Sequence, residues 1–246
     1  MTGTPNGAPA FYARRGGSRR DDWWTLLHPP YTLWHLSYVV IGACVAPQVD
    51  GERLVATVLA FALAVGVAAH ALDELHGRPL RTGIPSASLI AATFAALAGA
   101  VALGVMGVGR VGTGLIGFIV VGVILAVGYN LELVGGRLHN DVMFALSWGA
   151  FPVLTAYYAQ AGTIGVAAIA AAIAAYALSA AQRSLSTPAR NLRRRALLVT
   201  GTIEHTDGTS TPVTIDSLRT PLEAALKAMA FGLVALAASL AWLRLA

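Results

Sequence analysis

Charge and cysteine are both scarce in this sequence. Only 12% of its 246 residues are charged, whereas 56% are hydrophobic. Soluble domains carry about 25% charged residues, so this balance excludes an ordinary soluble fold. The one cysteine, Cys44, lies in an apolar run, which excludes an internal disulfide framework and cysteine-based zinc motifs. The sequence also lacks an HExxH motif, so it carries no complete zinc-protease signature.

Long apolar runs are what the sequence has instead. Runs of about 18 or more apolar residues are long enough to cross the hydrocarbon core of a bilayer. Their high alanine and glycine content suits helices that pack closely in lipid. The sequence therefore predicts an all-α integral membrane protein with seven spanning helices, at residues 31–49, 54–72, 86–107, 112–130, 142–161, 163–182 and 222–243.

Composition divides the chain into four segments. They are a disordered leader, a six-helix membrane core, a basic segment and a last spanning helix, at residues 1–25, 26–182, 183–221 and 222–246. The leader is rich in Gly, Pro, Ser and Arg, a composition typical of disorder. In the basic segment, apolar and polar residues alternate around Asp207 and Gly208, which predicts a small β-hairpin before the last helix.

The arginines are distributed unevenly between the two ends of the predicted spans. A cytoplasmic N-terminus leaves only Arg53, Arg110 and Arg244 outside. It places the others inside, namely Arg14, Arg15, Arg19, Arg20, Arg78, Arg81, Arg137, Arg183, Arg190, Arg193, Arg194, Arg195 and Arg219. Excess arginine marks cytoplasmic loops, so this orientation is the predicted one. The net charge of +5 is then a topology signal and not a nucleic-acid footprint.

Histidines and acids gather at one depth of the predicted bundle. All six histidines fall on its cytoplasmic side, at His28, His35, His70, His76, His139 and His205. In the stretch "AHALDELHG", His70 precedes Asp73 and Glu74 by three and four residues, so one helix face presents all three. Polar groups inside a span are costly, so we expect His35 and His70 to face a functional cavity.

This cluster has the composition of a metal site. Imidazoles and carboxylates from several helices suit Zn, Fe or Mn, whereas an all-oxygen set would suit Mg. The sequence predicts a site for one or two such ions, with ligands among His28, His35, His70, Glu74, Glu132 and His139. Glu74 and Glu132 are also candidate bases, and Asp73 a candidate catalytic residue that binds the metal or orients a histidine. The alternative is that water reaches these groups at the interface, the favoured interpretation for His205.

The same stretches carry a resemblance to a known family. "AHALDELHG" followed by "RPLRTGIP" is similar to the motif NDxxDxxxD and the turn RPLPSGxI of the UbiA superfamily of intramembrane prenyltransferases. The upstream "HPPYTLWHLSYVVIGACVAP" resembles the first helix of that family, and "YNLELVGGRLHND" its tyrosine-containing loop. The resemblance covers residues 26–162. It implies a helical bundle that acts on an isoprenoid, a quinone or another lipid.

The sequence departs from that family at its acidic motifs. Alignment places His70, Asp73 and Gly77 at the three aspartates of the first motif, and the basic "AQRSLSTPARNLRRR" at the second. The family binds Mg-diphosphate through those aspartates, so such binding is disfavoured here. Arginines are available to hold a phosphate directly, and the candidate substrate-binding residues are Arg78, Arg81, Tyr129, Arg137, Asn140 and the 190–195 cluster.

Three functions are compatible with these patterns. The first is a UbiA-like membrane enzyme whose site is rebuilt as a His/carboxylate metal centre acting on a lipid. The second is a Mg-dependent prenyltransferase or terpene cyclase with a degenerate diphosphate site. The third is a carrier or metal-handling membrane protein without catalysis. A carrier places polar groups near the bilayer midplane, whereas the polar groups here gather on one side, which favours an enzyme.

Overall fold

The computed structural model describes residues 10–14 and 17–246, so part of the predicted leader lies outside the described residues. The helices are α1 (Arg19–Leu26), α2 (Pro29–Cys44), α3 (Gly51–Phe61), α4 (His70–Leu75), α5 (Ser86–Val111), α6 (Leu115–Asn130), α7 (Asp141–Ala145), α8 (Phe151–Ala161), α9 (Val166–Arg194) and α10 (Ile215–Leu245). Two π-helical stretches, η1 (Ala62–Ala69) and η2 (Leu146–Ala150), join α3 to α4 and α7 to α8. The strands are β1 (Thr202–Glu204) and β2 (Ser210–Pro212).

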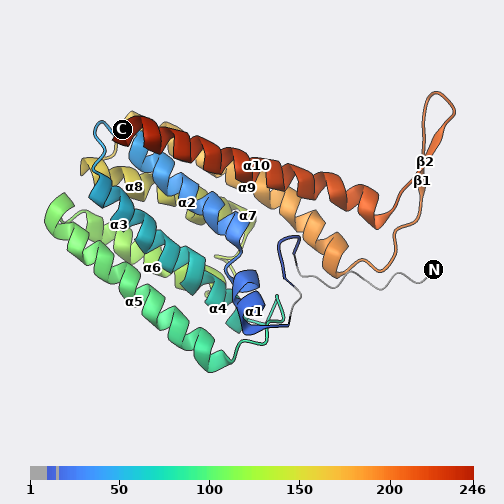
Figure 1. The fold of residues 1–246 in the computed structure, drawn as a ribbon, viewed down its shortest axis with the longest axis horizontal. Helices are drawn as coiled ribbons and strands as arrows, with labels where there is room; N and C mark the ends of the chain where they lie inside the picture. Colours follow the sequence, from blue (N-terminus) through green and yellow to red (C-terminus); the bar gives the residue numbers. More distant parts are fainter. Residues whose placement is uncertain (1–9, 15–16) are drawn as a thin grey trace.

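The helices run back and forth along one long axis, as Figure 1 shows. We call the end where α4 and α6 finish and α2 begins the cavity end, and the opposite one the far end. A buried cluster around Trp34, Tyr38, Val153 and Leu233 joins α2, α8, α9 and α10. Within it Trp34 Nε1 donates to Tyr38 Oη over 2.6 Å. This core fixes α2, and hence the histidines that α2 carries, against the rest of the bundle.

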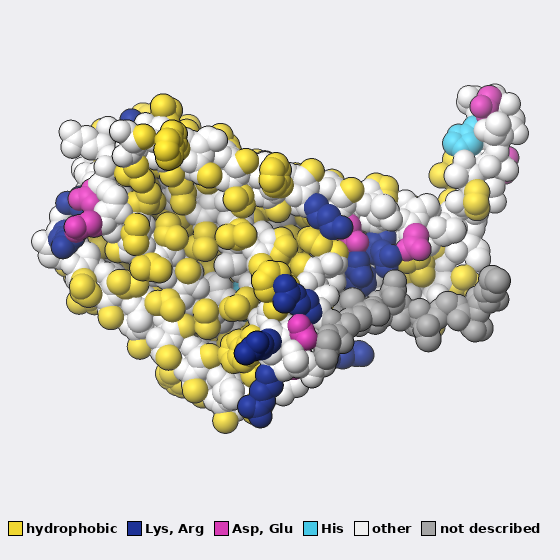
Figure 2. Space-filling view, viewed as in Figure 1, with side chains coloured by type: hydrophobic (Ala, Val, Ile, Leu, Met, Phe, Trp, Pro, Cys, Tyr) yellow, Lys and Arg dark blue, Asp and Glu magenta, His cyan; other side chains and the backbone are white. Residues whose placement is uncertain are grey.

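Each of the seven predicted spans falls on a helix of the structure. Five helical stretches of the described chain are long and apolar enough to cross a membrane, at Gly51–Leu75, Ser86–Val111, Asp141–Ala161, Val166–Arg194 and Ile215–Leu245. The helix Leu115–Asn130 is apolar but shorter. In Figure 2 the middle of the visible face is mostly hydrophobic, while charged side chains gather toward its ends. An all-helical membrane architecture fits these features, and the number of spans stays a prediction.

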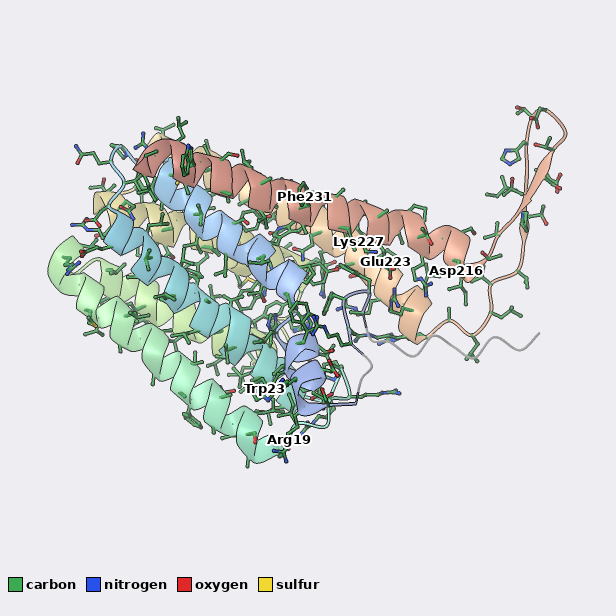
Figure 3. All side chains as sticks on the ribbon, in the orientation of Figure 1. Arg19, Trp23, Asp216, Glu223, Lys227 and Phe231 are labelled. Carbon is green, nitrogen blue, oxygen red and sulfur yellow. The ribbon has the colours of Figure 1, made fainter. Side chains whose placement is uncertain are left out.

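Two segments outside the predicted spans contain helix. Part of the leader forms α1, because Ser18 caps its N-terminus by accepting from Asp21 N and two acids lie in its first turn. The basic segment begins as helix, because α9 continues to Arg194 and packs beside α10. There Arg193 forms an ion pair with Glu223 of α10, which is labelled in Figure 3. The helix therefore continues beyond residue 182, where the sequence places the end of the sixth membrane span.

The predicted β-hairpin is confirmed. Strands β1 and β2 pair antiparallel, with Ile203 opposite Thr211. Asp207 Oδ1 accepts from the backbone N of Thr209 at 2.9 Å and from its hydroxyl at 2.7 Å, which holds the turn. Every residue of both strands is exposed, and the hairpin projects away from the helices in Figure 1.

Candidate functional site

A polar cavity of about 560 Å³ opens at the cavity end of the bundle. It lies between α2, η1, α4, the loop after α6 and the last turns of α9, with α10 closing one side. The structure brings to its wall the predicted site residues His28, His35, His70, Asp73, Tyr129, Glu132 and His139, together with the arginines of the predicted 190–195 cluster. Residues more than a hundred positions apart in the sequence therefore share one cavity.

Three of these histidines are held in the same tautomer. The Nδ1 atom of His35 lies 2.9 Å from the carbonyl of Trp148, and that of His70 lies 3.1 Å from the carbonyl of Gly66. The Nδ1 atom of His139 lies 3.1 Å from the carbonyl of Tyr129. A carbonyl oxygen only accepts, so each Nδ1 carries a hydrogen, and Nε2 is the nitrogen that holds the lone pair in the neutral form of each ring. This is the arrangement of metal-binding or proton-accepting histidines.

The π-helical stretches supply two of these acceptors. Gly66 belongs to η1 and Trp148 to η2, and both stretches border the cavity. A π-helical turn has the wider i→i+5 hydrogen-bond register and recurs at functional sites. The two widened turns orient His35 and His70 through main-chain atoms alone.

His28 has an unusual backbone and an unpaired ring atom. It has a φ of 47° immediately before Pro29, a left-handed conformation that is uncommon for a non-glycine residue. Its ring stacks on that of His70, with centroids 4.5 Å apart and an interplanar angle of 17°. Burial, followed by the charges of His70, Arg194 and Arg190, holds the pKa of His28 well below its usual range. The ring is therefore neutral and able to accept a hydrogen bond.

Three buried polar atoms on the cavity wall have no hydrogen-bond partner within the described chain. They are His28 Nε2, Tyr129 Oη and Gln182 Oε1. Leaving such an atom unpaired costs about 1–3 kcal/mol, so buried polar groups usually have a partner. Three of them around one cavity indicate a bound ligand or ordered water as the missing partner.

The carboxylates are less closely gathered than the imidazoles. Asp73 lines the cavity, and Glu132 lies 3.9 Å from both His76 Nε2 and His139 Nδ1, with its side chain 45% exposed. Among the residues that the structure describes, no group of three or more His, Cys, Asp or Glu side chains is close enough to hold a metal ion. The donor chemistry fits a metal, but the donors are not assembled around one point.

Glu74 has a different place from the one that the sequence predicted. Its side chain is fully buried, and it is not part of the cavity wall. Its Oε2 accepts from Leu80 N at 2.9 Å, while its Oε1 accepts from the N and hydroxyl of Thr82 at 2.8 and 2.9 Å. The carboxylate thus holds the "RPLRTG" turn against α4. Its oxygens are engaged by the turn rather than directed at the imidazoles, so Glu74 has a structural role.

Four of the predicted substrate-binding residues also lie off the cavity wall. Arg78 donates to the carbonyl of Ile84 at 2.7 Å and to Ser86, so it braces the same turn. Asn140 caps α7 by accepting from Met143 N at 2.9 Å. Arg81 and Arg137 are exposed on the loops beside the cavity.

Tyr12, which comes from the predicted leader, was not among the residues expected at the site. Trp24 Nε1 donates to the carbonyl of Tyr12 at 3.1 Å, and this places the tyrosine ring 5.2 Å from the ring of His28. Burial raises the pKa of Tyr12 well above its usual value, so the phenol stays protonated. The aromatic pair "FY" in a leader otherwise rich in Gly, Pro and Arg was the available signal. Gln182 was missed as well, as a polar residue near the end of an apolar run.

An apolar groove of about 270 Å³ adjoins the polar cavity. It runs between α3, α5, α6 and α8, and it shares Val65 and Trp148 with the cavity wall. At the far end it is bordered by Arg53 and by Arg110, whose guanidinium pairs with Glu52 over 2.6 Å. The polar cavity and the apolar groove thus share a wall at Val65 and Trp148.

Comparison of this chain with family models, with curated proteins and with solved structures finds no significant match. The resemblance to the UbiA superfamily accordingly stays a prediction from the sequence.

Proposed function

We propose that this protein is a UbiA-like membrane enzyme that acts on an amphiphilic lipid, such as an isoprenoid or a quinone, with a metal held by imidazoles of the polar cavity. The observation that carries the proposal is that two unlike spaces lie side by side. A polar cavity with three unpaired buried atoms meets an apolar groove at Val65 and Trp148. A lipid has the same division between head group and tail.

The tail of such a lipid would occupy the apolar groove. Phe61, Phe118 and Phe151 line it together with aliphatic side chains of α5 and α6. Moving the tail from the bilayer into the groove gains little free energy, because both surroundings are apolar. The groove therefore selects the tail by its shape, whereas the polar wall gives specificity for the head group. The head group would then lie beside His28, His70 and Asp73, where it meets the unpaired atoms.

The imidazole wall is suited to binding a metal ion. His35, His70 and His139 each direct Nδ1 to a main-chain carbonyl, which leaves Nε2 as the nitrogen available to a metal, and His28 has an unpaired Nε2. Asp73 and Glu132 add carboxylates on the same wall. Neutral imidazoles with a few carboxylates favour Zn, Fe or Mn over Mg. Such an ion would polarise a head group or activate water.

Elemental analysis of the purified protein tests this proposal. The full chain is purified in detergent without added metal, beside His70→Ala and the control His205→Ala. His205 is on the exposed hairpin and pairs with Thr211, so its loss should leave the metal in place. We expect stoichiometric Zn, Fe or Mn in the wild type and the control, and at most a tenth of it in His70→Ala, since removing a ligand weakens binding by about tenfold or more.

Two results would contradict the metal proposal. One is wild-type protein without bound metal, and the other is equal metal in wild type and His70→Ala. Consumption of a prenyl diphosphate that requires added Mg would instead favour the second function, prenyl transfer or cyclisation. The basic end of α9 argues against that outcome, because Arg190, Arg193 and Arg194 stand where acids would have to bind Mg.

A further inference from the structure

A short piece of the leader lies on the wall of the polar cavity. We call residues 10–14 the strap, and its residues 10–12 line the cavity. The rings of Phe11 and Tyr12 both meet the ring of Tyr31 on α2 edge-on, with centroids 6.0 and 5.7 Å apart. The two strap rings also meet each other, at 5.2 Å. The strap is therefore packed against the start of α2, beside which it lies in Figure 1.

The strap also reaches the helices on the other side of the cavity. Lys227 Nζ of α10 lies over the ring of Phe11, 5.1 Å from its centroid, which is a cation–π contact. The phenol of Tyr12 interacts electrostatically with Asp73 of α4 and with Arg194 of α9. The two aromatic side chains thus lie between α2 on one side and α9 and α10 on the other. A segment that covers the cavity would occupy this place.

Individual contacts, and no regular structure, hold the strap to the bundle. Residues 10–14 all lie outside the helices and strands. Trp24 Nε1 of α1 donates to the carbonyl of Tyr12 at 3.1 Å, and the main-chain N of Arg14 donates to Thr25 Oγ1 at 3.2 Å. The guanidinium of Arg14 is exposed and lies 4.0 Å from the centroid of the Trp24 ring. An irregular segment held in this way opens at a lower free-energy cost than a helix of the core.

The closed strap covers the imidazole wall. Tyr12 lies against His28, and the ring of His28 stacks in turn on that of His70. Three rings in succession therefore lead from the strap into the cavity. Many enzymes place a movable segment over such a site, so that water is excluded during the reaction and reactants enter between turnovers.

We propose that the strap is a lid of the polar cavity, which closes when Phe11 and Tyr12 pack against α2 and opens when they leave it. Its part in regulating the site rests on the proposed function, whereas the closure itself requires neither metal nor lipid. No described residue of the strap lines the apolar groove. The lid therefore controls the entry of water, ions and polar reactants, and leaves the path of a lipid tail open.

The labelling rate of a cysteine inside the cavity tests the lid. Ser186 lines the cavity, so Ser186→Cys is introduced into the full chain, in which the native Cys44 is buried. The purified protein in detergent is treated with a small water-soluble methanethiosulfonate reagent, with and without the double substitution Phe11→Ala and Tyr12→Ala. We expect labelling at least about tenfold faster without the two rings, because a minor open state is populated to about 10% or less.

Two matched controls accompany the measurement. Ser210→Cys on the exposed hairpin should be labelled at one rate in both backgrounds, since the lid does not reach it. Arg20→Ala, an exposed substitution in α1, should leave the rate of Ser186→Cys unchanged. Melting temperatures show whether each variant is folded. If the double variant is not folded, Lys227→Ala gives the second test, because it removes the cation–π contact alone and should speed labelling by about twofold to fivefold.

Two results would overturn the lid. One is an equal labelling rate of Ser186→Cys with and without the strap rings, or with and without Lys227 where that variant is the test. The other is a full chain whose Ser186→Cys is never labelled while the protein stays folded, since the strap is then a fixed wall. Labelling is measured without added metal or lipid. The metal content of the same samples reports on the imidazoles, so failure of one proposal leaves the other measurable.

Discussion

The carboxylate of Glu74 determines the shape of one turn at the entrance to the site. It is buried and accepts three hydrogen bonds, two of them from the main chain of the turn that follows α4. Buried main-chain donors require a partner, and Glu74 is the acceptor for both of these N–H groups. The spacing that made Glu74 look like a neighbour of His70 in a metal site also lets it reach forward to residues 80–82.

Replacing Glu74 tests this role at the residue scale. Glu74→Ala should destabilise the protein by about 2–5 kcal/mol, because two buried N–H groups lose their acceptor. Glu74→Gln keeps one carbonyl oxygen and should lose less. Thermal unfolding in detergent measures both, with Glu204→Ala on the exposed hairpin as control. Unchanged melting of Glu74→Ala together with loss of bound metal would show that it is a ligand after all.

Residue types and spacing were enough to identify part of the candidate site. His28, His35, His70, Asp73 and His139 were predicted, and all lie on the cavity wall. Helical spacing and depth carried that information. The main-chain partners of the histidines could not be predicted, because Trp148 is 113 positions from His35 and meets it only in the folded chain.

At the scale of the elements, close helix contacts position the cavity. A Cβ atom on Gly42 of α2 would lie 2.4 Å from the carbonyl oxygen of Val153 on α8. A Cβ on Gly149 of η2 would lie 2.6 Å from the carbonyl oxygen of Ala175 on α9. Real side chains do not approach main-chain atoms this closely, so both glycines are needed for the present packing. Small residues at helix contacts are typical of helices in lipid.

Gly42→Ala should therefore lower stability although it improves helix propensity. The new methyl group would push α2 from α8, and overpacking of this kind costs about 1–3 kcal/mol or more. Gly117→Ala in α6 is the matched control, because nothing lies within 4 Å of its Cβ position. Thermal unfolding should show a lower melting temperature for the first variant and an equal or higher one for the second. The same melting temperature in both variants would contradict the close contact.

The lengths of the apolar runs predicted where the helices lie, but they did not predict where every helix ends. The apolar run of the sixth predicted span stops near residue 182, whereas α9 continues to Arg194. Leucine, alanine and arginine favour helix, and the ion pair of Arg193 with Glu223 holds this extension against α10. The extension carries Arg190, so the basic wall of the cavity depends on a contact between distant segments.

At the scale of the whole molecule, polar chemistry is collected at one end. The polar cavity, its arginines and the hairpin belong to the cavity end, while the far end holds the pair Arg110–Glu52 and the hydrogen bond from Arg244 to the carbonyl of Ala46. Arginine excess marks the cytoplasmic face of a membrane protein. The orientation itself stays a prediction from the arginine distribution.

Cysteine labelling tests that orientation. The native Cys44 is buried, so single cysteines are placed at the hairpin turn by Thr206→Cys and at the turn between α5 and α6 by Thr113→Cys. In intact cells a membrane-impermeant maleimide should label Thr113→Cys and leave Thr206→Cys unlabelled. Inside-out vesicles should give the reverse. Labelling of Thr206→Cys in intact cells would place the cavity on the outer face.

The sequence by itself determined the class of this protein. Apolar length predicted the helices, alternation around Asp207 predicted the hairpin, and helical spacing predicted the histidines of the site, because each of these signals is local in the chain. Only the tertiary structure decided which polar residues share a cavity. It brought Arg190 and Tyr12 to the histidines and took Glu74 away to the turn. Those choices depend on contacts between segments far apart in sequence, which local patterns do not encode.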